Sequence, residues 1–263
     1  MDKPDNTNAY NVIAVIPAAG VASRLSGISG SKEMIPIGTR EDPITHHLVP
    51  KPVCLYLLEK YRTSGIGQCI IVTRKEKADI PDYFGDGERL GIDLSYLMIE
   101  QSCGTACTID QAYHRLQHAV VALGFPDILF SPDDGFARLL KRINNSQADV
   151  VLGLFPADKP EKTDMVDIDA SQQVRNIVIK PGQTDLHLTW GIAVWKPAFS
   201  EFLHEYVSAW QQQGNKAELH IGQVILAAIH QGMTVIGETI SDQPYLDIGT
   251  PDDLARAVNN VKT

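Results

Sequence analysis

A loop of small residues followed by two cations is the segment of this chain best suited to hold phosphate. The loop comes after an apolar run at 12–16 and is rich in small residues, namely Ala18, Ala19, Gly20, Ala22 and Ser23. Small side chains let backbone N–H groups approach phosphate oxygens, and a loop after a strand lies where open α/β sheets bind ligands. Arg24 and Lys32 follow and would add permanent positive charge. The segment therefore predicts a binding site for a nucleoside triphosphate.

Two familiar phosphate-binding patterns do not match this loop. A dinucleotide-binding fingerprint needs G-x-G-x-x-G, of which only Gly20 is present, and a P-loop needs a Gly-Lys-Ser/Thr ending that the segment lacks. The remaining alternative is an ordinary turn between a strand and a helix, in which Arg24 and Lys32 are simply solvated.

Two segments with carboxylates are candidates for holding a metal ion beside the phosphates. Asp133 and Asp134 follow a strand predicted at 127–131, and a carboxylate at the end of a buried strand lies at the ligand-binding edge of the sheet. Asp247 lies shortly before the last predicted helix. Carboxylate oxygens suit Mg²⁺, a hard cation that also bridges phosphates. The alternative is that both segments are plain turns, since Pro-Asp-Asp-Gly favours a turn and Asp247 precedes a helix cap.

Short apolar runs alternate with helical patterns through the first half of the chain. Strands are predicted at 12–16, 68–73, 94–99, 127–131 and 148–155, and helices at 52–63, 105–123 and 136–144. A polar loop is predicted at 39–50. This βαβα order indicates an α/β fold with a mostly parallel, Rossmann-like sheet that helices cover on both faces.

The pattern changes after Pro156. The later elements are a hairpin from strands 165–168 and 174–179, strands at 186–195 and 234–239, and helices at 197–213 and 219–231. A final helix begins at Pro251, and Thr250 is placed to cap it. We interpret 1–263 as one domain, with a nucleotide-binding part at 11–155, a part with a small inserted β subregion for the substrate at 156–250, and a terminal helix at 251–263.

Composition narrows the possible partners. The chain has 263 residues and a formal net charge of −9, which opposes binding to nucleic acid or to an anionic membrane surface. The polar segment 1–10 predicts no signal peptide, and no apolar run is long enough to span a membrane. The four cysteines include no C-x-x-C pair, which argues against a zinc ribbon, and Cys69 is expected to pack in the core. A reduced, cytoplasmic setting is the simplest expectation.

The phosphate-binding segment resembles the signature of sugar-1-phosphate nucleotidyltransferases. That signature reads approximately (A/P)-A-G-G-x-G-T-R-L and then P-K-x-M-x-P-I, whereas this chain reads PAAGVASRL at 17–25 and SKEMIPI at 31–37. The run KEMIPI is similar to bacterial UTP–glucose-1-phosphate uridylyltransferases, and the family also contains glucose-1-phosphate thymidylyltransferases. Ala22 stands where the family usually has Gly, and the spacing from Arg24 to Lys32 is shorter than usual.

Two further segments match the nucleotide and metal sites of this family. Residues 245–251 read YLDIGTP, which is similar to W-x-D-x-G-T-P, and the resemblance implies that Asp133 and Asp247 share a metal ion. Residues 101–106 read QSCGTA, which is similar to Q-x-x-x-x-G-T/L-A. This match implies that Gln101, Gly104 and Thr105 contact the nucleotide, with Gln101 pairing to a uracil or thymine edge.

The second half of the chain carries the matches that concern the acceptor. Ile179 precedes Lys180 and Pro181, a run that resembles E-K-P and implies that Lys180 binds the phosphate of the sugar. Ile179 replaces the usual Glu. Residues 190–192 resemble x-G-x-Y, which implies that Trp190 and Gly191 line the sugar pocket; core packing of Trp190 is the alternative.

The resemblance implies an enzyme of nucleotide-sugar and polysaccharide biosynthesis that uses Mg²⁺. It would transfer a nucleotidyl group from an NTP to a sugar 1-phosphate and release pyrophosphate, with UTP or dTTP favoured. The implied catalytic residues are Arg24, Lys32, Asp133 and Lys180, and the implied nucleotide-binding loop contains Ala18, Ala19, Gly20 and Ser23. With no segment after the final helix, the resemblance implies no acyltransferase activity. A homo-oligomer is left open by analogy.

Three alternatives stay open at this point. The first is transfer of a cytidylyl or other nucleotidyl group to a phosphate that is not a sugar phosphate. The second is a catalytically silent paralogue that binds nucleotide. The third is a glycosyltransferase that uses a finished nucleotide sugar, although such an enzyme would favour an Asp-x-Asp motif over the Asp133–Asp134 pair.

Overall fold

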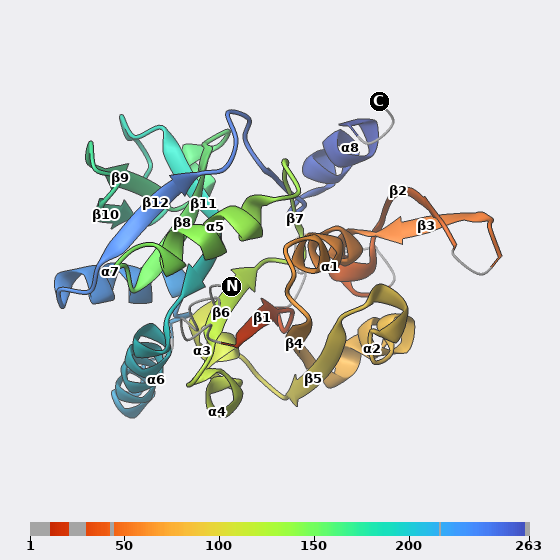
Figure 1. The fold of residues 1–263 in the computed structure, drawn as a ribbon, viewed down its shortest axis with the longest axis horizontal. Coiled ribbons are helices and arrows are strands. Elements are labelled where there is room, and N and C mark those ends of the chain that lie inside the picture. The colour runs from red at the N-terminus through yellow and green to blue at the C-terminus, as the bar shows by residue number, and fades with distance from the viewer. Residues whose placement is uncertain (1–10, 21–29, 43–44, 216, 261–263) are drawn as a thin grey trace, which may run out of the picture.

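The computed structural model describes residues 11–20, 30–42, 45–215 and 217–260. Within these residues, nine strands form one mixed sheet, with the order β10-β9-β11-β6-β1-β4-β5 and with β8 and β12 joined beside β11 (Figure 1). Helices cover both faces of this sheet, so the predicted α/β architecture is confirmed.

The parallel part of the sheet is built around β1. This strand, Val12–Pro17, lies between β4 (Gln68–Arg74) and β6 (Val120–Gly124), and β5 (Asp93–Ile99) follows at the edge. Ala14 pairs with Cys69 of β4 and with Ala122 of β6, both in parallel register. The carboxyl ends of β1 and β6 therefore lie at the same edge of the sheet, where the loops that follow them can form one site.

The other part of the sheet reverses direction at β11. This strand, Leu188–Trp195, runs antiparallel to β8 (Val150–Pro156) along one side. Along its other side it runs antiparallel to β9 (Met165–Ile168) near its start and to β6 near its end. The hairpin partner of β9 is β10 (Val174–Val178), and β12 (Val235–Thr239) lies parallel to β8. The predicted hairpin and the predicted small β subregion are present.

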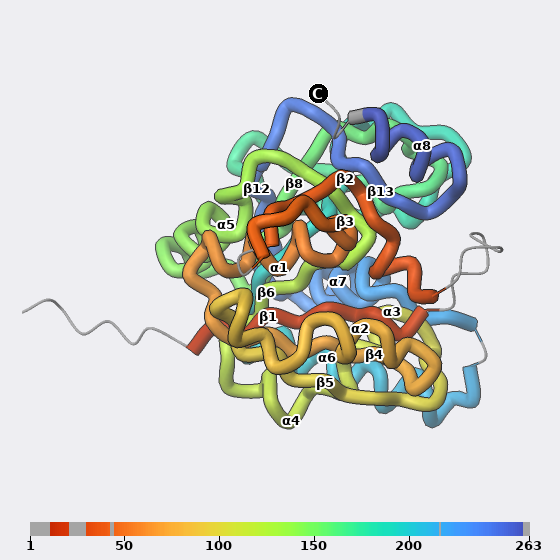
Figure 2. Tube along the Cα trace, turned by 90° about the vertical axis from the view of Figure 1, so that its right-hand side faces the viewer, coloured from red at the N-terminus to blue at the C-terminus, as the bar shows by residue number. Residues whose placement is uncertain are grey.

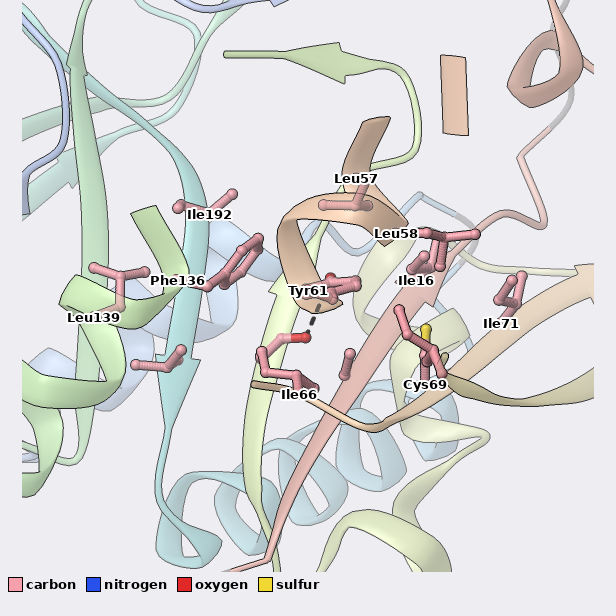
Figure 3. Packing of buried hydrophobic residues seen from close by; sticks show 14 of the residues in the cluster. Ile16, Leu57, Leu58, Tyr61, Ile66, Cys69, Ile71, Phe136, Leu139 and Ile192 are labelled. Carbon is pink, nitrogen blue, oxygen red and sulfur yellow. Dashed lines mark hydrogen bonds between the residues drawn. The ribbon is translucent and has the colours of Figure 1, made fainter. Parts of the chain in front are cut away.

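Alternate residues of the strands pack on two different helical layers. On one face are α1 (Val53–Thr63), α2 (Asp79–Phe84) and α5 (Gly135–Asn144). On the other are α3 (Thr105–Asp110), α4 (Tyr113–Leu116), α6 (Pro197–Gln212) and α7 (Ile221–His230). Figure 3 shows Tyr61 of α1 between Phe136 of α5 and Ile16 of β1, with a distance of 4.6 Å between the Tyr61 and Phe136 ring centroids. The Tyr61 hydroxyl donates to the Ala122 carbonyl at 3.3 Å, so its polar atom is satisfied inside the core.

A third, smaller cluster joins the last helix to the rest of the molecule. The hairpin β2 (Pro36–Glu41) and β3 (Leu48–Pro52), the pair β7 (Ile128–Leu129) and β13 (Leu246–Asp247), and α8 (Pro251–Asn260) meet at one end of the molecule (Figure 2). The Thr250 hydroxyl accepts a hydrogen bond from the Asp253 backbone N–H at 3.3 Å, which confirms the predicted cap of α8.

One predicted element is wrong in a way that affects the site. The helix predicted at 105–123 consists of two short helices, α3 and α4, followed by strand β6. A strand buried on both faces reads as a continuous apolar run, which cannot be distinguished from a buried helix by periodicity. The strand predicted at 127–131 shrinks to β7, and the polar loop predicted at 39–50 lies largely within the β2–β3 hairpin.

The cysteines differ from the reduced state that we expected. A disulfide joins Cys103 to Cys107 across the first turn of α3, with 5.6 Å between their Cα atoms. Cys103 lies in the turn that precedes α3, so the disulfide links this turn to the start of the helix. Cys54 and Cys69 are buried thiols, as predicted for Cys69. Among the described helices, none is long and apolar enough to cross a bilayer.

Candidate functional site

A cleft of about 640 Å³ opens at the carboxyl edge of β1 and β6 and continues along the wall formed by β11 and the start of α7. Its lining has two ends. We call the first the carboxylate end, formed by Lys32, Asp127 and Asp247. We call the second the Trp190 end, formed by Asp164, Lys180 and Trp190. The sequence predicted four of these six residues.

The loop after β1 forms the floor of the cleft. Ala19 and Gly20 line it, whereas Ala18 is buried and its N–H donates to the Val72 carbonyl at 2.8 Å. The Ala18 carbonyl accepts a hydrogen bond from Lys77 Nζ at 2.8 Å. Ser23 and Arg24 lie outside the described residues, so their predicted contacts with the nucleotide stay predictions.

A buried ion pair positions this loop. Lys77 Nζ contacts Glu33 Oε1 at 2.7 Å, and the Glu33 side chain is 1% exposed. Burial raises the pKa of Glu33, while the charge and hydrogen bond of Lys77 act in the opposite direction. Lys77 therefore connects the loop carbonyl to a carboxylate that would otherwise be buried without a counter-charge.

Lys77→Met is expected to destabilise the fold by about 3–5 kcal/mol at pH 8, because Glu33 then stays buried and ionised without a partner. The Glu33 pKa is already raised above its ordinary value of 4.5, and the variant raises it further. The cost is present above the folded-state pKa and disappears as the pH falls toward the unfolded value, so part of the stability should return at pH 5. Urea unfolding at both pH values measures this.

The control for Lys77→Met is Lys75→Met, which changes an exposed lysine in the same 3₁₀ turn, Lys75–Lys77. Its unfolding midpoint should stay close to that of the parent at both pH values. A Lys77→Met loss that is equal at pH 5 and pH 8 would contradict the electrostatic explanation.

The carboxylate end brings together residues from three distant segments. Lys32 begins a 3₁₀ turn, Lys32–Met34, and its Nζ contacts Asp127 Oδ2 at 2.5 Å. Asp247 lies in β13, which pairs with β7 so that Asp247 faces Ile128, the neighbour of Asp127. Burial acts to lower the pKa of Lys32, but Asp127 and, to a smaller extent, Asp247 raise it above its ordinary value. Lys32 is therefore held as a cation between carboxylates.

Asp133, which the resemblance pairs with Asp247, does not line the cleft. Its side chain is 77% exposed and forms an ion pair with Lys60 of α1. The physical reason is the position of β6: this strand ends at Gly124, so the first carboxylate at the ligand-binding edge is Asp127. Recognising 120–124 as a strand would have identified Asp127 from the sequence.

The N-terminus of α3 forms another part of the cleft wall. Gly104 and Thr105 line the cleft as predicted, whereas Gln101 is exposed and does not. Gly104 has φ +113°, and a Cβ there would lie 2.6 Å from the backbone nitrogen of Leu219. The Leu219 N–H donates to the Cys103 carbonyl at 2.6 Å, so the backbone before α7 lies directly against this turn.

Gly104→Ala is expected to cost about 3 kcal/mol or more, because it combines an unfavourable positive φ with a clash against backbone. The matched control is Gly182→Ala, since a Cβ at Gly182 meets no atom within 4 Å and the residue has no such φ. Urea unfolding of the two variants measures the difference. Equal midpoints would show that the turn before α3 relaxes without cost.

The Trp190 end lies on the antiparallel part of the sheet. Lys180 and Trp190 line the cleft, and Lys180 follows β10 with a positive φ of 42°. Gly191 does not line it; a Cβ there would lie 3.0 Å from Tyr245 Cδ1, so this glycine leaves room for the tyrosine ring. Burial raises the pKa of Tyr245 to about 12, assisted by Asp247, Asp164 and Asp127. Tyr245 and Asp164 also line the cleft, and the sequence did not indicate either of them, since neither lies at a motif position with assigned chemistry.

The donor set at the carboxylate end fits a hard divalent cation. Asp127 and Asp247 both line the cleft and carry carboxylate oxygens. Among the described residues there is no group of three or more His, Cys, Asp or Glu side chains arranged for a metal ion. Mg²⁺ commonly binds through one or two carboxylates and completes its shell with water and substrate phosphates, so two carboxylates are sufficient.

Comparisons with known proteins agree with this geometry. The chain is 28% identical over 231 residues to a glucose-1-phosphate thymidylyltransferase of Streptomyces griseus, covering 82% of this chain and 61% of that protein. It is 25% identical over 248 residues to a D-glycero-α-D-manno-heptose 1-phosphate guanylyltransferase of Aneurinibacillus thermoaerophilus, covering 93% of this chain and 96% of that protein. The chain thus spans about three fifths of the length of the thymidylyltransferase.

A solved structure shares the fold. A Bacillus anthracis protein crystallised with sucrose superposes with a TM-score of 0.80 at 21% identity, covering 95% of both chains. The family model described as nucleotidyl transferase matches residues 13–263. This match includes both ends of the cleft, and the chain therefore belongs to the nucleotidyl transferase family.

Proposed function

We propose that this protein transfers a nucleotidyl group from an NTP to a sugar 1-phosphate and releases pyrophosphate. The observation that carries the proposal is a single cleft with Lys32 and two carboxylates at one end and Lys180 at the other. The family of the chain and the activities for which its relatives are named agree with this reaction.

The reaction needs no protein nucleophile. An oxygen of the sugar phosphate attacks the α-phosphorus of the NTP, the new P–O bond forms, and the bond to the pyrophosphate leaving group breaks. Catalysis then consists of alignment and charge stabilisation. Lys32 stabilises negative charge on the triphosphate, and Lys180 holds the phosphate of the acceptor. Ala19 and Gly20 leave their backbone open to the nucleotide, and Arg24 is proposed to add charge beside them.

Asp127 and Asp247 would hold the Mg²⁺ ion, which neutralises charge on the reacting phosphates when it is bound. Asp127 forms an ion pair with Lys32, so the proposed metal ligand lies directly beside the cation proposed to bind the triphosphate. This assignment replaces Asp133 with Asp127 and retains Asp247.

UTP and dTTP are the proposed nucleotides, and the acceptor is proposed to be a hexose 1-phosphate. KEMIPI favours UTP or dTTP through its resemblance to uridylyltransferases. One relative is a guanylyltransferase, which makes GTP the principal alternative nucleotide. Gln101, exposed outside the cleft lining, lends less support to base recognition than its motif position suggested.

The test is pyrophosphate release in the presence of Mg²⁺, with each of UTP, dTTP, GTP, CTP and ATP crossed with a panel of sugar 1-phosphates and phosphocholine. Release that requires one NTP and one sugar 1-phosphate supports the proposal and identifies both substrates. Release with phosphocholine alone would show a nucleotidyltransferase with a different acceptor. Thermal stabilisation by an NTP without any release would indicate a silent paralogue.

A further inference from the structure

One oxygen of the Asp164 carboxylate, at the Trp190 end of the cleft, is buried without a hydrogen-bond donor. Its Oδ1 atom accepts no hydrogen bond from the described residues. Its Oδ2 atom occupies the space that a side chain at Gly222 would need, so the first turn of α7 is shaped around this carboxylate. Leaving a buried acceptor unpaired costs free energy, which suggests that another molecule supplies the donor.

A donor without an acceptor lies on the neighbouring strand. β9 pairs with β11 through Met165 and Thr189, and the Thr189 hydroxyl donates to the Asp164 carbonyl at 2.9 Å. Asp164 precedes Met165 and Trp190 follows Thr189, so both residues lie next to this pair of the ladder. The Trp190 indole Nε1–H is buried and has no partner within the described part of the chain. Both residues line the cleft, so an unpaired acceptor just before β9 and an unpaired donor on β11 lie beside the same cleft.

Asp164 lies among charged groups from both ends of the cleft. Burial raises the pKa of Asp164, and the charges of Lys180 and His220 act to lower it. Asp164 also contributes to the raised pKa of Tyr245, together with Asp247 and Asp127 of the carboxylate end. The Asp164 carboxylate thus lies close to the lysine proposed to bind the acceptor phosphate. Ile179, across the β9–β10 hairpin, is apolar and adds no polar group to this wall.

We propose that Asp164 and Trp190 together select the acceptor by binding hydroxyl groups of its sugar ring. This inference rests on the proposed function and identifies what its acceptor must carry. A hydroxyl both donates and accepts, so it can satisfy the carboxylate and the indole N–H, whereas a methylene can satisfy neither. A site built to pair with a substrate hydroxyl discriminates strongly against the analogue that lacks it, because the buried groups are then left unpaired.

The experiment combines one protein substitution with the removal of single hydroxyl groups from the substrate, in the manner of a double-mutant cycle. Pyrophosphate release is measured with the preferred sugar 1-phosphate and with its monodeoxy analogues, using the parent protein and Asp164→Asn. In the parent, one deoxy position should lower kcat/KM at least about 10-fold, as expected for a hydrogen bond to a charged group. Asp164→Asn should raise the KM for the full sugar phosphate roughly 10- to 100-fold, and the penalty for that same deoxy position should largely disappear.

Two readouts separate recognition from a structural effect. The KM for the NTP should stay within about two-fold in Asp164→Asn, since the carboxylate end is unchanged. Its melting temperature without ligand should not fall, because burying a neutral amide costs less free energy than burying a charged carboxylate. The matched control is Asp167→Asn, which changes another aspartate, in β9 but outside the cleft lining, and should leave every constant unchanged.

Two results would overturn the inference in distinguishable ways. If the parent enzyme turns over a sugar 1-phosphate but the deoxy penalty is the same in Asp164→Asn at every position, this inference fails and the proposed function stands. If no sugar 1-phosphate is turned over or bound by the parent protein, both fail together.

Discussion

Asp127→Asn is expected to lower the rate of pyrophosphate release roughly 10²- to 10³-fold, the usual cost of losing one preorganised electrostatic contact. Asp127 presents its carboxylate to the cleft beside Asp247, and Asn keeps the shape while removing the charge. The Mg²⁺ concentration needed for the half-maximal rate should rise, because one of the two proposed carboxylate ligands becomes a neutral amide. Steady-state kinetics over a Mg²⁺ titration measures both effects.

The matched control is Asp133→Asn, which tests the metal pair that the sequence resemblance implied. The Asp133 side chain is 77% exposed and pairs with Lys60 outside the cleft, so its loss should change the rate less than about two-fold. If Asp133→Asn is the severely impaired variant and Asp127→Asn is nearly normal, Asp127 is not the metal ligand. The pair of Asp133 and Asp247 that the resemblance implied is then favoured.

Lys32→Ala should have an effect of similar size, about 10²- to 10³-fold on kcat/KM for the NTP. Lys32 lines the cleft, and the neighbouring carboxylates hold its pKa above the ordinary value, so it is fully charged at neutral pH. Removing it deletes a cation facing the triphosphate and leaves Asp127 and Asp247 to repel the same phosphates. Initial rates at varied NTP concentration, with the acceptor saturating, measure this loss.

Lys141→Ala is the control for charge alone, because Lys141 is an exposed lysine of α5 that does not line the cleft. Both variants lower the net charge by one unit, but only Lys32→Ala should impair turnover. A normal NTP KM and kcat in Lys32→Ala would remove Lys32 from the proposed mechanism, whatever the melting temperature of the variant.

The sequence predicted most of the strands and helices, and the exception explains why Asp133 was expected at the cleft in place of Asp127. Periodicity distinguishes an amphipathic helix from a half-buried strand, but β6 is buried on both faces and reads as a short apolar run. Extending the preceding helix over β6 moved the predicted strand end from Gly124 to Ser131. The first carboxylates after that wrong end were Asp133 and Asp134, and Asp127 was absorbed into a strand.

At Gly104 the backbone explains the residue type. The motif predicted a contact with the nucleotide, and the positive φ and close approach to Leu219 require a glycine there. Asp164 could not have been predicted as a binding residue, because its place in the cleft depends on pairing between β9 and β11 and on the position of α7. Such contacts are set by tertiary packing and leave no local pattern in the sequence.

The central position of β6 also determines how this chain must fold. Its two partners are β1, where Val12 pairs with Val120, and β11, where Val121 pairs with Trp195, and β8 later gains β12 through Val150 and Val235. Each pairing joins segments that are far apart in the sequence, so the entropy cost of closing a long loop arises before the stabilising contacts form. This slows folding and leaves strand edges unpaired in the meantime. During synthesis the sheet is incomplete until β12 emerges from the ribosome, so we expect slower translation at low temperature to increase the yield of folded protein.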